Sequence, residues 1–306
     1  MHPAVSVILF TVTSGAGFGA IALIGAGYPL RDHPLAVLLT AMAAGGLAVA
    51  GLVASTFHLG HPERAWRAFS QWRSSWLSRE GVLAVAALVG FGLHTLARLF
   101  TDWPVAGIGW AVSALSLATI FSTAMIYAQL RTVPHWHSAL TPAAYLGFGL
   151  ASGFLLVAAA GNVSALGGVS VALIAMALVV PAWAVKIAWW QRAASATLAA
   201  RDMTAESATG LGAIGRVRLL ERPHSGANYL TREMVHRIGR KHAGKLRVAA
   251  IAIGAMLPTL IAALVAWLQL ETVFLLAGFV AMMAGLFVER WLFFAEASHS
   301  VSLYYD

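Results

Sequence analysis

Long apolar runs make up most of the chain, and shorter polar stretches separate them. A helix needs about 20 apolar residues to cross the hydrocarbon core of a bilayer. Eight runs are long enough, at roughly 4–28, 34–58, 80–100, 105–130, 143–161, 165–190, 247–268 and 272–297. Apolar positions are continuous within each run and do not alternate with polar ones, so the runs predict helices and exclude a membrane β-barrel. The pattern therefore predicts an all-α, polytopic membrane protein, with eight transmembrane helices forming one anchor domain over residues 1–306.

The first run is expected to stay in the mature chain. The letters MHPA before it lack the basic start of a signal peptide, and the run is too long for one. It contains GAGFGA, whose glycines are Gly15, Gly17 and Gly19. No strand is expected before these glycines and no lysine follows them, so a phosphate-binding loop is excluded. Small residues in a membrane helix favour close helix packing, and this is the role we expect for all three.

Composition supports a membrane protein and narrows the possible cofactors. Hydrophobic residues make up 59% of the 306 residues and charged residues 10%, whereas soluble domains carry about 25% charged residues. The chain has no cysteine, which excludes a disulfide, a thiolate zinc site and a cysteine-ligated iron–sulfur cluster within it.

The connections between the runs predict the orientation in the membrane. Eight spans place both termini on one side, together with the three long connections, at 59–79, 131–142 and 191–246. Of the 20 Lys and Arg residues, all but Arg31 and Arg98 belong to this side. The positive-inside rule then predicts that both termini are cytoplasmic.

The longest connection, 191–246, is strongly basic. Its charge fits the positive-inside rule and attraction to anionic lipid headgroups, and it equally fits a docking surface for a cytoplasmic protein. Nucleic-acid binding is disfavoured because no groove-reading motif accompanies the charge.

One cytoplasmic stretch, STFHLGHPERAWRAFSQWRSSWLSREG at 55–81, places His58 at the end of the second run and Glu80 at the start of the third. A quinone headgroup needs hydrogen-bonding and proton-relaying groups beside an apolar zone. Neutral His and a partly desolvated Glu supply both. Spacing alone favours a simpler interpretation, in which both are interfacial residues that cap helix ends.

The same stretch is rich in Trp and Arg. Trp66, Trp72 and Trp76 fit a short helix lying in the headgroup layer, with the indole rings as anchors. Arg67 and Arg73 fit the positive-inside rule alone.

A second polar stretch, TVPHWHSALTPAAY at 132–145, brings His135, Trp136, His137 and Tyr145 to the cytoplasmic face. The His-x-His spacing hints at a metal, but no third ligand is evident, so a metal site is disfavoured. Haem is a minor possibility, because His94 and His58 lie near opposite faces and make poor axial partners.

In the last run, VERWLFFAEASHS places Glu289 and Arg290 deep in apolar sequence. Ionisable residues at such depth are costly and usually face a protein interior or a cavity. Two interpretations stay open: a structural pair with a neighbouring helix, or the lining of a proton or quinone path.

These stretches together resemble the membrane anchor subunits of the dimethyl sulfoxide reductase family (DmsC-like). The resemblance rests on HLGHPERAWRAF, SWLSREG, RTVPHWHSALTP and ERWLFFAEASHS in their order among the eight runs. The opening MHPAVSVILFTVTSGAG and the loop TGLGAIGRVRLLERPHSGANYLTREM look most like the anchor of cytoplasmic sulfite dehydrogenase (SoeC-like). The prototype reductase anchor has a much shorter loop between its sixth and seventh spans.

The resemblance implies a metal-free subunit of a respiratory enzyme in the bacterial cytoplasmic membrane. Its partners would be an iron–sulfur subunit and a molybdopterin catalytic subunit, and its ligand a ubiquinone or menaquinone. The family's quinol-linked His and Glu match His58 and Glu80, and its P-x-R-A arginine matches Arg64. The predicted quinone-binding residues at the cytoplasmic face are therefore His58, Glu80, Arg64, Trp76, Arg79 and His135, with His58 and Glu80 also moving protons.

Three alternatives remain from the sequence. An anchor of the same family can oxidise menaquinol and feed a reductase, since the anchor sequence barely distinguishes the direction of electron flow. A small-solute transporter predicts buried polar residues near the midplane, whereas the polar residues here gather at one face. A purely structural anchor would lack a quinone site, and His58 and Glu80 separate it from the preferred interpretation.

Overall fold

The computed structural model describes residues 4–28, 34–57, 59–101, 103–160, 168–221 and 242–304. Within these ranges the chain is helical and contains no strand. Eight helical segments are long and apolar enough to cross a membrane. They are α1 (Val5–Gly25), α2 (Pro34–Thr56), α3 (Trp76–Phe100), α4 (Ala106–Ala128), α5 (Leu140–Ala160), α6 (Gly168–Ser195), the composite α10 (Ala243–Ile251), η3 (Ala252–Met256) and α11 (Leu257–Trp267), and α12 (Leu275–Ala295).

The predicted eight-helix architecture is confirmed, with shifts at several helix ends. Helix α3 begins at Trp76, four residues before the predicted start, because Ser75 is still extended and ends the preceding turn. Helix α6 continues to Ser195, past the predicted end of its apolar run. The added residues are Trp-Leu-Ser-Arg at 76–79 and Gln-Arg-Ala-Ala-Ser at 191–195, so each extension brings an arginine into the helix at the end of its apolar run.

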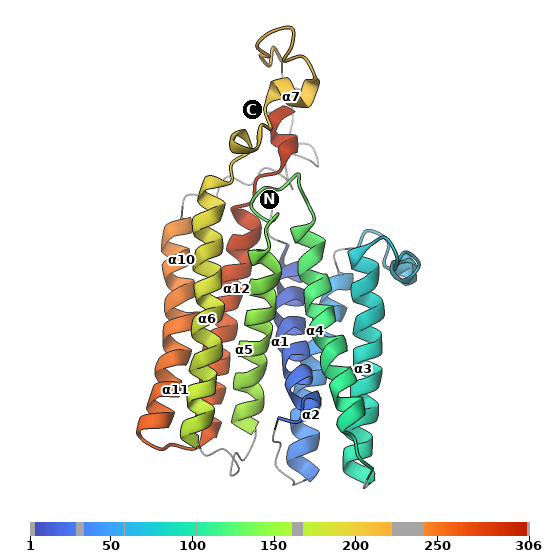
Figure 1. Ribbon diagram of the computed structural model, residues 1–306, viewed down its shortest axis with the longest axis vertical. Helices are drawn as coiled ribbons and strands as arrows, with labels where there is room; N and C mark the ends of the chain where they lie inside the picture. Colours follow the sequence, from blue (N-terminus) through green and yellow to red (C-terminus); the bar gives the residue numbers. More distant parts are fainter. Residues whose placement is uncertain are drawn as a thin grey trace.

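Both ends of the described chain lie at the same end of the bundle (Figure 1). The polar segments gather there too: η1 (Pro62–Phe69), the turn between α4 and α5, α7 (Ala205–Thr209) and η5 (Ser300–Tyr304). The connections at the opposite end are short. This arrangement agrees with the predicted sidedness of the long connections. Below, the end that carries the termini is called the polar end.

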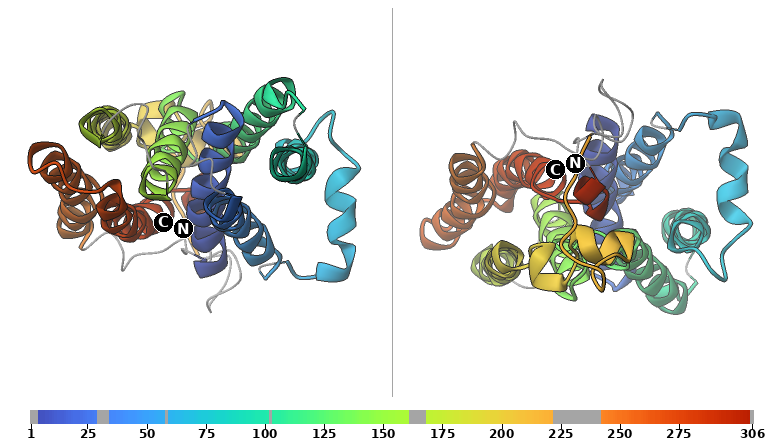
Figure 2. Two further views of the ribbon diagram at one scale, coloured as in Figure 1. Left: turned by 90° about the horizontal axis from the view of Figure 1, so that it is seen from below. Right: turned by 90° about the horizontal axis from the view of Figure 1, so that it is seen from above.

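Helix α1 forms the centre of the bundle and packs against α2, α4, α5 and α12 (Figure 2). A side chain at Gly17 would collide with the α2 backbone, and one at Gly19 would collide with Gly149 of α5. These two glycines therefore let the helices approach closely, as predicted. The prediction is wrong for Gly15, because a Cβ added there meets nothing within 4 Å.

The seventh span is interrupted by a π-helical turn at η3. Pro258 lies one residue into α11, and its ring cannot fit the carbonyl four residues earlier in a regular α-helix. The wider turn accommodates that ring. It also places Gly254 against Gly285 of α12 and the indole of Trp183 on α6. A side chain at Gly254 would have no room. The glycine therefore lets the seventh span pack closely against both the sixth and the last spans.

The segment between α2 and α3 arches away from the bundle and carries η1 beside α3 (Figure 2). The predicted short helix exists, as 3₁₀ geometry over Pro62–Phe69. Trp66 and Trp72 expose 66% and 53% of their surface, which fits anchoring in the headgroup layer. Trp76 differs from them because it begins α3 and packs edge-on against Phe121 of α4.

Candidate functional site

Glu80 is a buried carboxylic acid in the first turns of α3. Only 4% of its surface is exposed, and the hydroxyl of Thr123 on α4 donates a hydrogen bond to its Oε1. Tyr127, one turn further along α4, interacts electrostatically with Glu80. A carboxylic acid held in an apolar interior by one hydroxyl can take up and release a proton. This is the property that a quinone-reducing site needs.

The residues around Glu80 in the sequence SWLSREG hold this acid in place. The hydroxyl of Ser78 donates to the carbonyl of Ala68 and accepts from the backbone N–H of Gln71 at 3.0 Å. Gly81 leaves room for the ring of Phe69, which would lie 3.2 Å from an added Cβ. The motif therefore fastens the η1 segment onto α3 immediately beside the buried acid.

Arg79 and Trp76, predicted to bind quinone, fix the turn that enters α3. Arg79 donates from Nε to the carbonyl of Trp72 at 3.1 Å and from Nη2 to that of Arg73 at 2.6 Å. Its guanidinium lies 4.3 Å from the centre of the Trp76 ring. These contacts use the guanidinium to close the turn and leave the Trp76 ring between Arg79 and α4.

Arg64 lies on η1, is about half exposed and pairs loosely with Glu63, with 3.7 Å between Nε and Oε1. It faces solvent and makes no contact with Glu80. This placement suits a surface that meets another subunit better than one that binds a headgroup. His58 lies outside the described residues.

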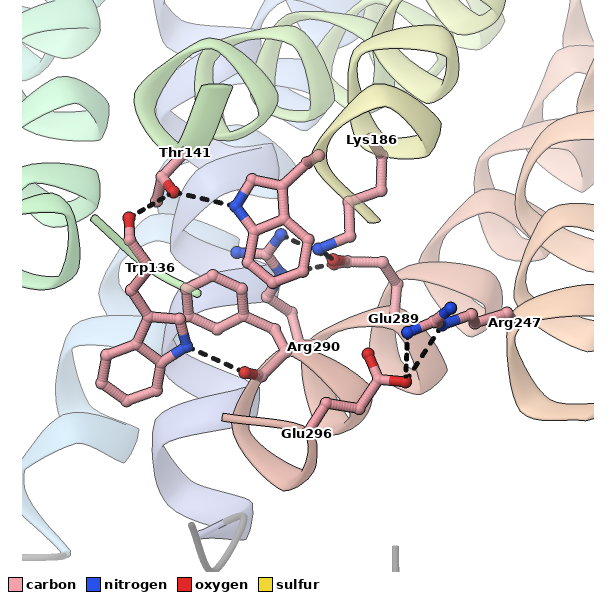
Figure 3. Close-up of polar contacts among 9 residues, drawn as sticks. Trp136, Thr141, Lys186, Arg247, Glu289, Arg290 and Glu296 are labelled. Carbon is pink, nitrogen blue, oxygen red and sulfur yellow. Dashed lines mark hydrogen bonds and ion pairs between the residues drawn. The ribbon is translucent and has the colours of Figure 1, made fainter. Parts of the chain in front are cut away.

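The stretch RTVPHWHSALTP forms a tight turn between α4 and α5 that is packed into the bundle. The indole of Trp136 donates to the carbonyl of Phe293 at 2.9 Å, and Thr141 donates to the carbonyl of Trp136 at 2.7 Å (Figure 3). Arg192 of α6 donates to the carbonyls of three residues of this turn, which are Pro134, His135 and His137. The stretch thus joins α5, α6 and α12 at the polar end.

His135 is not brought to Glu80. It lines a pocket of about 240 Å³ with Arg247 of α10 and Glu296, on the side of α6 and α10. Arg247 and Glu296 form an ion pair across the pocket, with 2.8 Å between Nη2 and Oε1 (Figure 3). Glu80 lies instead between α3 and α4. Within the described ranges, no three His, Cys, Asp or Glu side chains cluster as metal ligands.

A buried ionic cluster occupies the interior between α6 and α12, formed by Lys186, Glu289 and Arg290 (Figure 3). Lys186 Nζ lies 2.5 Å from Glu289 Oε1. Arg290 contacts both carboxylate oxygens, from Nε at 2.5 Å and from Nη2 at 2.9 Å. All three residues are at most 4% exposed. One carboxylate thus serves two cations, and the cluster carries one excess positive charge.

Aromatic rings surround this cluster and extend toward Glu80. Lys186 Nζ lies 3.6 Å from the ring centre of Trp189, and the Arg290 guanidinium lies 4.2 Å from that of Tyr145. Tyr145 and Tyr127 stack with 6.0 Å between ring centres. Tyr127 also interacts electrostatically with both Arg290 and Glu80. Tyr127 and Tyr145 therefore both lie within electrostatic range of Arg290 and of the buried acid Glu80.

The sequence alone leaves both interpretations of Glu289 and Arg290 open, and the structure shows the pairing with a neighbouring helix, between Glu289 and Lys186 of α6. The sequence analysis does not identify Lys186 or Thr123. A single lysine within the apolar run 165–190 was a usable signal, since charges at such depth need a partner. Its partner lies on a distant helix, however, and Thr123 is an ordinary small polar residue of a membrane span. The polar residues do not all gather at one face, because this cluster lies within the sixth and last spans.

Comparison with known proteins gives the family. The family model of the DMSO reductase anchor subunit (DmsC) matches residues 1–295. The chain belongs to this family. It is 34% identical to the C subunit of sulfite dehydrogenase from Allochromatium vinosum, over 100% of this chain and 99% of that protein. It is 35% identical to the anaerobic dimethyl sulfoxide reductase chain YnfH of Escherichia coli K12, over 36% of this chain and 39% of that one. No solved structure matches.

The DmsC family membership makes this chain a membrane anchor subunit of an oxidoreductase complex. The resemblance drawn from the four sequence stretches is thereby confirmed. Three of those stretches have structural roles in the described chain. SWLSREG fastens η1 to α3, and RTVPHWHSALTP ties the α4–α5 turn to α6 and α12. ERWLFFAEASHS supplies Glu289 and Arg290 of the ionic cluster.

Proposed function

We propose that this anchor passes electrons from an iron–sulfur subunit to a membrane quinone, and that the enzyme it serves is a sulfite dehydrogenase. Full-length similarity to the C subunit of a sulfite dehydrogenase supports the choice of enzyme. In this proposal a molybdopterin subunit oxidises sulfite, and the iron–sulfur subunit delivers the two electrons to the anchor. This chain supplies the quinone site and the protons.

The observation that carries the proposal is the burial of Glu80 beside α4. Glu80 is only 4% exposed and accepts a hydrogen bond from the Thr123 hydroxyl. Burying an ionisable group in a membrane protein costs free energy, and such residues usually have a function. Reduction of a quinone to a quinol takes two electrons and two protons. Glu80 supplies one proton to the reduced headgroup and His58, hydrogen-bonded to a headgroup oxygen, supplies the other. Both groups regain their protons from the cytoplasm.

The proposed docking face for the two soluble subunits is the polar end of the bundle. It carries the η1 segment with Arg64, the α4–α5 turn, and the described parts of the 191–246 connection. In our proposal this end is cytoplasmic and the membrane is the bacterial inner membrane. The connections at the other end offer little surface for a large partner.

A second candidate is an anchor that oxidises menaquinol and supplies electrons to a reductase of the dimethyl sulfoxide type. The partial similarity to YnfH supports it. In that case the same residues accept protons from the quinol, because proton transfer at Glu80 works in both directions.

The test replaces Glu80 by Gln, which keeps the shape and removes the ionisable proton. We expect quinone-dependent turnover of the purified complex to fall by at least about 100-fold, as for loss of a general acid–base group. Activity with an artificial dye that takes electrons directly from the soluble subunits stays at the wild-type level.

Glu271→Gln is the matched control, since Glu271 is exposed at the opposite end of the bundle. It should change neither activity. Equal losses of dye and quinone activity in Glu80→Gln would assign Glu80 to assembly of the complex instead.

A further inference from the structure

A small cavity between α1, α5 and α12 has two buried hydrogen-bond donors that the rest of the described chain leaves unused. Its volume is about 20 Å³, and Arg290, Tyr145 and Gly15 are among the residues that line it. Arg290 Nη1 and Tyr145 Oη have no hydrogen-bond partner among the described residues. Both residues are almost fully buried, at 4% and 6% exposed. A space of this size holds one water-sized group.

The two donors require an acceptor. Arginine carries five N–H groups, and Glu289 already accepts from Nε and Nη2 of Arg290. The remaining nitrogen, Nη1, can only donate. The guanidinium also interacts with the Tyr145 oxygen, but the tyrosine O–H still needs an acceptor of its own. Buried donors without an acceptor are costly, and native structures avoid them. The excess positive charge of the Lys186–Glu289–Arg290 cluster further favours an atom that bears negative charge.

Gly15 gives a second, independent indication that the cavity has a use. A glycine inside a helix is destabilising relative to alanine, unless it is needed for close approach or an unusual backbone conformation. Gly17 and Gly19 are needed for packing, but a Cβ on Gly15 would meet nothing. Gly15 itself lines the cavity. The missing side chain therefore preserves space next to Arg290 and Tyr145.

We propose that this cavity binds one headgroup oxygen of the quinone, held by hydrogen bonds from Arg290 Nη1 and Tyr145 Oη. The inference rests on the proposed quinone function and adds two binding residues that the sequence did not indicate. Reduction places negative charge on a headgroup oxygen before protonation, and a preorganised guanidinium stabilises that charge. Neither donor gives up its proton. Tyr145, which lines the cavity, stacks on Tyr127, and both tyrosines lie within electrostatic range of Glu80. The cavity therefore belongs to the same region of the bundle as the proton-transferring acid.

Quinone is the expected occupant because the cavity lies inside the bundle at the level of the membrane spans. A free inorganic anion would have to leave water to reach it, whereas quinones partition into the bilayer. The walls contributed by Phe148, Leu286 and Val12 are apolar and suit the ring edge of a headgroup.

The test fills the cavity without removing either donor. Gly15→Ala adds a methyl group at the cavity wall, and Gly46→Ala is the matched control, because a Cβ at Gly46 also meets nothing and faces away from the core. The intact complex in lipid nanodiscs is titrated with 2-heptyl-4-hydroxyquinoline N-oxide, a quinone-site inhibitor, by fluorescence quenching. Turnover is measured with decylubiquinone and menadione, and thermal unfolding is recorded for each variant.

We expect Gly15→Ala to weaken inhibitor binding by about tenfold, the size of one or two lost hydrogen bonds. The quinone KM should rise in proportion, with the unfolding temperature unchanged or raised. Tyr145→Phe should weaken binding several-fold, and Gly46→Ala should have no effect.

The inference is overturned if Gly15→Ala and Tyr145→Phe both bind the inhibitor as tightly as the wild type while Glu80→Gln loses quinone turnover. The proposed function would then still stand. An ordered water alone would give that result, with lowered unfolding temperature in Tyr145→Phe. If Gly15→Ala weakens inhibitor binding while Glu80→Gln keeps normal quinone turnover, the cavity is supported as a quinone-binding site and the proton-transfer role of Glu80 is contradicted.

Discussion

At the scale of single residues, the main finding is that one carboxylate compensates two cations inside the bundle. Glu289 contacts Lys186 on α6 and Arg290 next to it on α12. Removing one partner of a buried ion pair is far more damaging than the net strength of the pair suggests, because the remaining charge is left uncompensated. The three residues therefore differ in what their loss would do.

Glu289→Ala should lower the free energy of unfolding by about 3–5 kcal/mol, since it leaves two buried cations without an anion. Lys186→Met should cost less, no more than about 1–2 kcal/mol, because the bidentate Arg290–Glu289 pair survives and the excess charge disappears. Denaturation of the purified protein in mixed micelles measures both changes. Equal losses for the two variants would contradict this account of the cluster.

At the scale of elements, the η1 segment is held to α3 by few contacts. Within the described chain its attachment includes the Ser78 hydroxyl, the Arg79 guanidinium and the Phe69 ring over Gly81. The rest of the segment is largely exposed, including Trp66, Trp72 and Arg64, and in our proposal these residues meet lipid and a partner subunit. A weakly attached amphipathic element suits a surface that orders further when another subunit docks.

Ser78→Ala should loosen this segment without unfolding the bundle. The hydroxyl makes two hydrogen bonds that bridge η1 and α3, and their loss costs about 1–2 kcal/mol. Amide hydrogen exchange over residues 62–75 should accelerate by about 5–30-fold in the isolated anchor. Ser74→Ala is the control, because the Ser74 hydroxyl contacts only the nearby carbonyl of Gln71. Unchanged exchange in Ser78→Ala would assign the attachment to Arg79 and Phe69 alone.

At the scale of the whole molecule, the two ends of the bundle differ in kind. One end carries both termini, η1, the α4–α5 turn and α7, whereas the other has short connections (Figure 1). The asymmetry of Lys and Arg along the sequence assigns the polar end to the cytoplasm. The orientation stays a prediction, and the absence of cysteine from the chain makes it simple to test.

Single cysteines at Ala213 and Glu271 should react from opposite sides of the membrane. Both positions are exposed, the first at the polar end and the second in the connection before α12. A membrane-impermeant maleimide should label Ala213→Cys only in inside-out vesicles and Glu271→Cys only in spheroplasts. A permeant maleimide, which should label both in either preparation, is the control. The reverse pattern would place the docking face outside the cytoplasm and contradict the proposed partners.

The sequence by itself determined the eight spans and the side on which the long connections gather. Both depend on local properties, the length of apolar runs and the position of charges between them, which the bilayer enforces on any helix. It also singled out Glu80, Glu289 and Arg290, because an ionisable residue at the edge of a span or within it is conspicuous.

Only the tertiary structure decided which of these residues meet. Lys186 and Glu289 are 103 positions apart, and no periodicity in either helix indicates that the two faces oppose each other. The same holds for Thr123 as the partner of Glu80, and for the difference between Gly15 and its neighbours Gly17 and Gly19. Helices in a bilayer are specified one at a time by hydrophobicity, but their pairing depends on side-chain packing across the whole bundle.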